Sequence, residues 1–128
     1  MKLSIFSVGD VVYSYGVIEF EGGEDFLGEI LKREPSQLKE ELEKKLNTAF
    51  TSFGFARGGL DYKGNEMPLV YLRVELEDGS DFSLEIYPGS ARSFSNTDAE
   101  EHYNTVVKLL TAIQPGLKLP RARLIGLA

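Results

Sequence analysis

Within the stretch from Met67 to Tyr87, apolar and polar residues alternate strictly over residues 70–76 and again over residues 82–87, on both sides of a short polar interruption. The apolar positions are Val70, Leu72, Val74 and Leu76 before the interruption and Phe82, Leu84 and Ile86 after it. A period of two is typical of β-strands that bury one face and leave the other open. The stretch therefore predicts a β-hairpin.

The connection of this hairpin follows from the requirement that both apolar rows share one face. A two-residue loop would place the rows on opposite faces, because a shift of one residue turns over every side chain of a strand. A three-residue loop, from Glu77 to Gly79, places Val74 opposite Phe82 and keeps the rows together. Gly79 would then take the left-handed conformation that this type of turn requires.

The N-terminal region predicts a second hairpin, with strands over residues 2–8 and 11–21 and a turn at Gly9 and Asp10. Ile18 and Phe20 define the buried face of the second strand. The same parity places Tyr13, Tyr15 and Val17 on the opposite face. A bulge at Gly16 would reverse the first half of this strand.

Three segments have apolar residues at helical spacing. We expect a short helix from Glu24 to Arg33, a longer one capped by Ser36 and ending at Gly54, and a third from Thr97 to Ile113. Thr97 and Glu100 match a capping box. The apolar stripe of the second helix consists of Leu38, Leu42, Leu46, Ala49, Phe50 and Phe53, and that of the third of Tyr103, Val106, Val107, Leu110 and Ile113.

The remaining segments are predicted as connections. Residues 55–66 form a glycine-rich flexible loop, and residues 88–96 form a polar connection. Residues 117–128 form a tail or a final edge strand, in which Pro120 suits an edge position.

The predicted order is ββ-αα-ββ-α-β. Without the first strand it resembles the ferredoxin-like arrangement, a likeness of topology alone. We expect residues 1–128 to form one α+β domain, a two-layer sandwich with a mainly antiparallel sheet and helices on one face.

Charge and composition exclude several kinds of chemistry and several kinds of partner. The chain has 14 basic and 20 acidic residues, a formal charge of −6, and no cysteine. Thiolate catalysis and sulfur-ligated metals are therefore excluded, and the acidic balance opposes binding to nucleic acid or to anionic membranes. No apolar run is long enough to span a membrane, and no N-terminal signal segment is evident, so we expect a soluble, cytoplasmic protein.

Two constellations are candidates for chemistry. His102 is the only histidine, and Asp98 lies four residues before it on the predicted third helix, a spacing that suits a base and its orienting carboxylate. The alternative, which we favour, is a solvated first helical turn, where acidic residues are expected. The second constellation is an anion site formed by the glycine-rich loop with Arg57, joined by Lys63 and Arg92. The alternative is that the glycines only mark turns. We expect no enzymatic activity, no cofactor and no metal.

The strand parities predict one further feature, an open sheet face rich in tyrosine. Tyrosine is enriched at protein interfaces because it combines a large apolar surface with a polar tip. The residues expected at this interface are Phe6, Tyr13, Tyr15, Val17, Tyr71, Arg73 and Tyr87. The sequence therefore predicts a small acidic protein-binding module, an adaptor or inhibitor, whose partner is another protein or a second copy of the chain. The alternatives are a structural subunit of a larger homo-oligomeric assembly, or an anion-binding protein or enzyme using Arg57, Arg92 and His102.

Overall fold

The computed structural model describes residues 2–8, 11–21, 32–57, 63–64, 70–87 and 89–117, with residues 2–8, 11, 12 and 57 described as backbone only. Its elements, in chain order, are β1 (Lys2–Val8), β2 (Val11–Glu19), α2 (Pro35–Leu46), β3 (Phe50–Arg57), β4 (Val70–Leu76), β5 (Asp81–Tyr87), β6 (Ser90–Ser95) and α3 (Ala99–Ile113).

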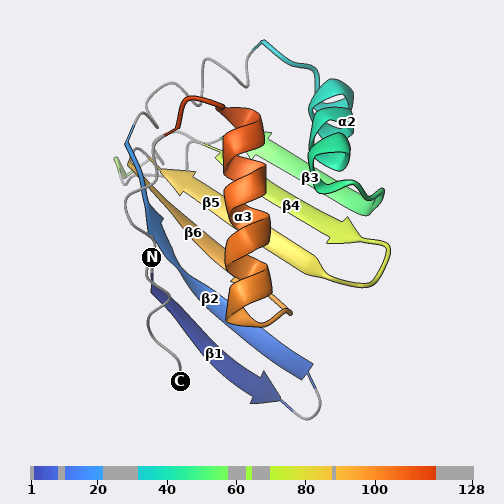
Figure 1. Ribbon diagram of the computed structural model, residues 1–128. Helices are drawn as coiled ribbons and strands as arrows, with labels where there is room; N and C mark the ends of the chain where they lie inside the picture. The colour runs from blue at the N-terminus through green and yellow to red at the C-terminus, as the bar shows by residue number, and fades with distance from the viewer. Residues whose placement is uncertain are drawn as a thin grey trace.

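The strands form one six-stranded antiparallel sheet in the order β1-β2-β6-β5-β4-β3. Strands β3 to β6 are successive neighbours. Strand β6 then pairs with β2, so the N-terminal hairpin of β1 and β2 extends the sheet at the edge opposite β3. Helix α3 lies across one face of the sheet, and α2 packs beside α3 and β3 (Figure 1). The expected fold class, an α+β sandwich with helices on one face, is confirmed.

The central hairpin has the predicted register. Val74 pairs with Phe82, and Leu72 pairs with Leu84. The carbonyl oxygen of Leu76 accepts a hydrogen bond from the Gly79 amide at 3.0 Å, and Gly79 has a φ of 89°. A residue with a Cβ would be strained there, so glycine suits the end of this three-residue loop.

Strand β2 also has the predicted parity. It pairs continuously with both neighbours, so the bulge considered at Gly16 does not occur. Ser14 and Ile18 are buried beneath the helices, whereas Tyr15 and Val17 are exposed on the other face.

The expected helix up to Gly54 is wrong, because the chain changes from helix to strand after Leu46. Asn47 takes a left-handed conformation with a φ of 55°, and the amide of Thr48 donates to the Glu43 carbonyl at 3.1 Å, which closes the helix end. The chain then continues as β3.

A bulge explains why β3 resembles a helix in sequence. Phe50 pairs with Leu76 and Ser52 with Glu75, so Thr51 is an extra residue in the strand. The extra residue places Phe50 and Phe53 on one face at a spacing of three, which is also helical spacing. Residues 55–57, expected in a loop, are the end of this strand.

The polar connection expected over residues 88–96 is also corrected, since residues 90–95 form β6, which lies between β2 and β5. With β3 and β6 included, four strands follow one another between α2 and α3. The described elements therefore do not have the ferredoxin-like order.

Two helix starts differ from expectation by one or two residues. Helix α2 begins at Pro35 with Glu34 as its N-cap residue, rather than after Ser36. Helix α3 is capped by Asp98 instead of Thr97, and the Asp98 carboxylate accepts the Glu101 amide at 2.8 Å. The turn at Gly9 and Asp10, most of the helix expected over 24–33, and the strand expected in the tail beyond Leu117 lie outside the described residues.

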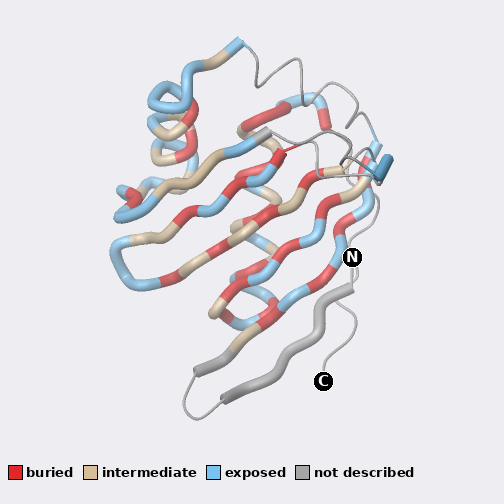
Figure 2. Tube along the Cα trace, turned by 180° about the vertical axis from the view of Figure 1, so that it is seen from behind, coloured by how far each residue is buried: buried red, intermediate tan, exposed pale blue. Residues whose placement is uncertain are grey.

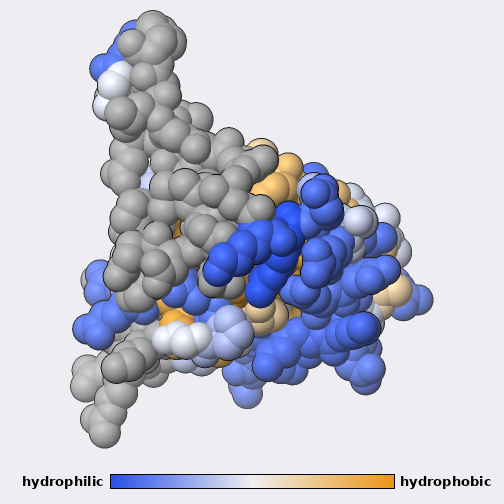
Figure 3. Space-filling model, turned by 90° about the horizontal axis from the view of Figure 1, so that it is seen from above, coloured by the Kyte–Doolittle hydropathy of each residue, from blue (hydrophilic) through white to orange (hydrophobic). Residues whose placement is uncertain are grey.

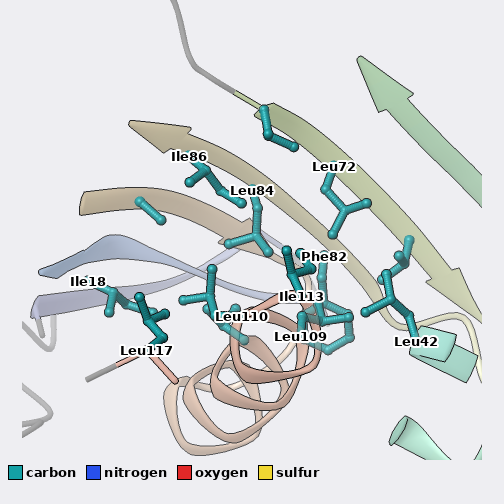
Figure 4. Packing of buried hydrophobic residues seen from close by; sticks show 14 of the residues in the cluster. Ile18, Leu42, Leu72, Phe82, Leu84, Ile86, Leu109, Leu110, Ile113 and Leu117 are labelled. Carbon is teal, nitrogen blue, oxygen red and sulfur yellow. The ribbon is translucent and has the colours of Figure 1, made fainter. Parts of the chain in front are cut away.

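The core lies between α3 and the sheet, where the apolar side chains of β4 and β5 point toward the helix (Figure 4). Leu109, Leu110 and Ile113 of α3 are completely buried against them. Leu42 of α2 extends the core toward β3. Seen from above, hydrophilic side chains predominate on the described outer surface, and apolar atoms show only in smaller areas (Figure 3).

Candidate functional site

The sheet face turned away from α3 is crossed by no described helix (Figure 2). Along β2, β5 and β6, and along β4 as far as Val74, buried residues alternate with exposed or half-exposed residues that belong to this face. We call it the open face. Its described side chains include Tyr13, Tyr15, Val17, Glu19, Ser52, Ala56, Tyr71, Arg73, Glu75, Asp81, Ser83, Glu85, Tyr87, Ser90, Arg92 and Phe94.

Every large hydrophobic side chain that is exposed among the described residues lies on the open face. Tyr15 is 51% exposed, Phe94 43%, and Val17 and Tyr71 37% each. These residues come from β2, β6 and β4, so the fold gathers them from distant parts of the chain. Apolar side chains scattered singly over a surface are ordinary, but a cluster on one side often marks an interaction site.

Strand pairing places the aromatic side chains in a continuous group. Tyr15 pairs directly with Phe94, and the Tyr13 ring stacks on the Phe94 ring with centroids 5.6 Å apart. Such cross-strand aromatic contacts hold the rings in a fixed arrangement. The open face therefore presents a preformed aromatic surface over β2 and β6.

The charged groups of the open face are held by neighbours on the same face. The Arg73 guanidinium donates to both carboxylate oxygens of Asp81, at 2.7 and 3.2 Å. This pairing raises the pKa of Arg73 above its ordinary value, first through the hydrogen bond and then through the charge of Asp81. The Arg92 guanidinium lies 5.6 Å from the centre of the Tyr87 ring, and the Tyr87 hydroxyl donates to Glu85 at 3.2 Å.

A hollow of about 530 Å³ lies in the open face over β5. Ser83 is its small central residue, with Phe94 of β6 on one side and Arg73 of β4 on the other. The residues that line it are Tyr13, Tyr71, Arg73, Asp81, Ser83, Phe94 and Asn96. Because a serine stands between larger side chains, the hollow has room for a side chain from another molecule.

The structure places six of the seven predicted interface side chains on the open face, namely Tyr13, Tyr15, Val17, Tyr71, Arg73 and Tyr87. The seventh, Phe6, pairs through its backbone with Tyr13. Sequence reasoning missed Phe94, because β6 was assigned to a connection. The alternation of Ala91, Ser93 and Ser95 with Arg92 and Phe94 is the signal that could have found it.

The three residues of the predicted anion site lie in different places. Arg57 ends β3, and Arg92 is on β6, which two other strands separate from β3. Neighbouring strands are about 4.8 Å apart, so the two backbones are roughly 14 Å apart in the sheet. Lys63 is exposed in the short described segment between β3 and β4. The anion site itself stays a prediction.

His102 is not the solvated residue that the sequence suggested, since its side chain is completely buried. Its Nδ1 lies 2.8 Å from the Ser14 hydroxyl of β2, and its Nε2 lies 2.6 Å from the Ser93 hydroxyl of β6. Ser14 also lies 2.8 Å from the Thr97 carbonyl oxygen, and Ser93 lies 2.9 Å from the Ser83 carbonyl oxygen.

The number of protons on His102 and the two serines determines which group donates in each hydrogen bond of this network. A neutral imidazole donates through one nitrogen and accepts at the other. One serine therefore donates its proton to the ring. The other accepts the ring N–H and donates its own proton to the neighbouring carbonyl oxygen, that of Thr97 for Ser14 or that of Ser83 for Ser93. Burial lowers the pKa of His102 from 6.5 to about 4, because the charged form loses its hydration, so the ring is neutral at pH 7.

The buried serines explain why sequence reasoning did not find this network. A helix-facing strand residue is expected to be apolar, whereas β2 and β6 place Ser14, Ser93 and Ser95 on that side. Ser95 shares a hydrogen bond of 2.8 Å with Thr97 at the start of α3. The network joins two strands to the helix, and the enclosed imidazole offers neither nitrogen to the surface.

Comparison with known proteins assigns no function. No protein-family model, curated protein or solved structure matches the chain significantly. No group of three or more potential metal ligands occurs among the described residues. In the same part of the chain, neither helix has the length and apolar character needed to cross a membrane.

Proposed function

We propose that this protein is a protein-binding module that acts through its open face. The observation that carries the proposal is that Tyr15, Val17, Tyr71 and Phe94 are all exposed on one side of the sheet. Burial of such side chains against a partner removes apolar area from water, which is the main favourable contribution to protein association.

The composition of the open face supports a protein partner. Aromatic residues and arginine are the types enriched at interfaces and at their energetic centres. The open face combines tyrosines and a phenylalanine with Arg73 and Arg92, and it keeps both guanidinium groups oriented through contacts on the same face. Oriented side chains lose less conformational entropy on binding than free ones.

Native mass spectrometry tests the proposal. The wild-type protein is measured alone and after exposure to a lysate of its own host, beside the double variant Tyr15→Ala/Tyr71→Ala. We expect the wild type to form a defined complex, with a second copy or with a captured protein, and the double variant to lose it. Both side chains lie on the open face, so the variant should keep its fold.

The matched control is Tyr103→Ala, which removes a half-buried tyrosine from α3 on the other side of the sheet. This variant should retain the complex. A complex that survives the double variant, or a wild-type protein that forms none, would contradict the proposal.

A further inference from the structure

We infer that the open face recognises a basic segment of its partner, and that the hollow over Ser83 receives an arginine or lysine side chain. This inference rests on the proposed function and specifies the chemistry of the partner.

The charges of the open face favour a cation. Its described side chains include four carboxylates, those of Glu19, Glu75, Asp81 and Glu85, against the two guanidinium groups of Arg73 and Arg92. The whole chain has the same sign, with a formal charge of −6. A basic partner is attracted to such a surface, and an acidic one is repelled.

The hollow itself combines aromatic walls with acidic neighbours. Phe94 pairs with Ser83, whereas Tyr71 pairs with Glu85 two residues further along β5, so the backbones of Phe94 and Tyr71 lie on a diagonal roughly 12 Å apart. A guanidinium or an alkylammonium group fits between two rings and is attracted to their faces. Along β5, Asp81 and Glu85 lie two residues before and after Ser83 on the same face.

The open face already holds one cation in this manner. Arg92 lies over the Tyr87 ring, and Glu85 accepts the Tyr87 hydroxyl beside it. The hollow offers similar groups to an incoming cation. Arg73 also lines the hollow, where Arg73 and Asp81 compensate each other's charge through two hydrogen bonds, so the attraction for a further cation comes from the rings and from the other carboxylates of the open face.

A peptide-display selection tests the inference. Random heptapeptides are selected on the immobilised wild-type protein, and each selected peptide is tested for binding to Ser83→Phe, which fills the hollow. The matched control is Ser36→Phe, which adds the same ring at an exposed position of α2. Melting temperatures of both variants establish that they fold.

We expect peptides that bind the wild type and Ser36→Phe but not Ser83→Phe, and we expect these peptides to be enriched in arginine or lysine. Replacement of the basic residue by citrulline, which keeps the shape of arginine without its charge, should weaken binding roughly three- to tenfold.

The remaining outcomes separate the inference from the proposed function. Peptides that depend on Ser83 but are acidic or purely apolar would overturn the inference and leave the open face as a binding site. Peptides that bind through Tyr15 but ignore Ser83→Phe would also overturn it. The absence of any peptide that depends on the open face would count against both.

Discussion

The sheet face that lies beneath α3, the inner face, has an apolar region and a polar region. On this face, β4 and β5 contribute only apolar side chains, such as Leu72 and Leu84, which are almost completely buried. Beneath the start of α3, β2 and β6 contribute Ser14 and Ser93, which hold His102 between them.

The two regions differ in how strictly they depend on particular partners. Apolar packing is non-directional, so a different apolar side chain of similar volume would serve almost as well. A buried hydroxyl or imidazole is stable only while its hydrogen-bond partners are present at the right distance. The apolar region should therefore contribute most of the stability, and the polar region should fix where α3 begins on the sheet.

The largest expected effect comes from a cavity in the apolar region. Leu84→Ala removes a side chain that is 0% exposed and should lower the free energy of unfolding by roughly 2–5 kcal/mol, measured by urea denaturation. Val17→Ala removes a partly exposed apolar side chain from the open face and should cost less than about 1 kcal/mol. Equal losses in the two variants would mean that the apolar region is not the centre of stability.

Acid should lower the free energy of unfolding through the polar region, because His102 is the group that titrates there. The folded protein takes up a proton at His102 only near pH 4, whereas the unfolded chain does so near its ordinary pKa of 6.5. The unfolded state therefore binds more protons between these values, and stability falls as the pH falls from 6.5 to 4. The shift corresponds to roughly 3 kcal/mol at most, and its contribution is fully present above pH 6.5.

His102→Gln provides the reference for this measurement. It keeps hydrogen-bonding groups near both serines but does not titrate, and the carboxylates that also titrate in acid are common to both proteins. The free energy of unfolding of the wild type should fall more steeply with acid than that of the variant. Parallel pH profiles would show that the folded protein does not hold His102 in its neutral form.

A smaller effect is expected from the loss of one hydroxyl from the network. Ser93→Ala leaves Nε2 of His102 without its 2.6 Å partner and should cost about 1–3 kcal/mol. Ser83→Ala, which removes a hydroxyl from the open face, should change stability by about 0.5 kcal/mol or less.

A triple variant sharpens the contrast between the two regions. Ser14→Ala/Ser93→Ala/His102→Leu makes the polar region apolar, and it should cost less than the sum of the three single changes, because no polar group is left without a partner. Strictly additive losses would show that the three side chains do not act as a network.

The open face could be predicted in large part because it depends on short-range patterns. Tyr15 and Val17 were placed by parity within one strand, and Tyr71 by parity within the central hairpin. Phe94 could not be placed in the same way, because the inward residues of β6 are an alanine and two serines, which give no apolar period. The contact between Phe94 and Tyr15 depends on the pairing of two strands that are more than 70 residues apart in sequence.

The buried network lay beyond sequence reasoning for a related reason. Nothing local to His102 distinguishes a buried imidazole from a solvated one at the start of a helix, where acidic neighbours are ordinary. Its two partners come from β2 and β6, and only the crossing of α3 over both strands brings them within hydrogen-bonding distance.

By itself, the sequence determined the central hairpin with its register, the parity of β2, and the presence of α2 and α3, because turn geometry and side-chain periodicity act over a few residues. The tertiary structure alone decided the strand order, the bulged β3, the serine-lined β6 and the environment of His102. These features depend on contacts between distant segments, and a buried polar residue has the same appearance in a sequence as an exposed one.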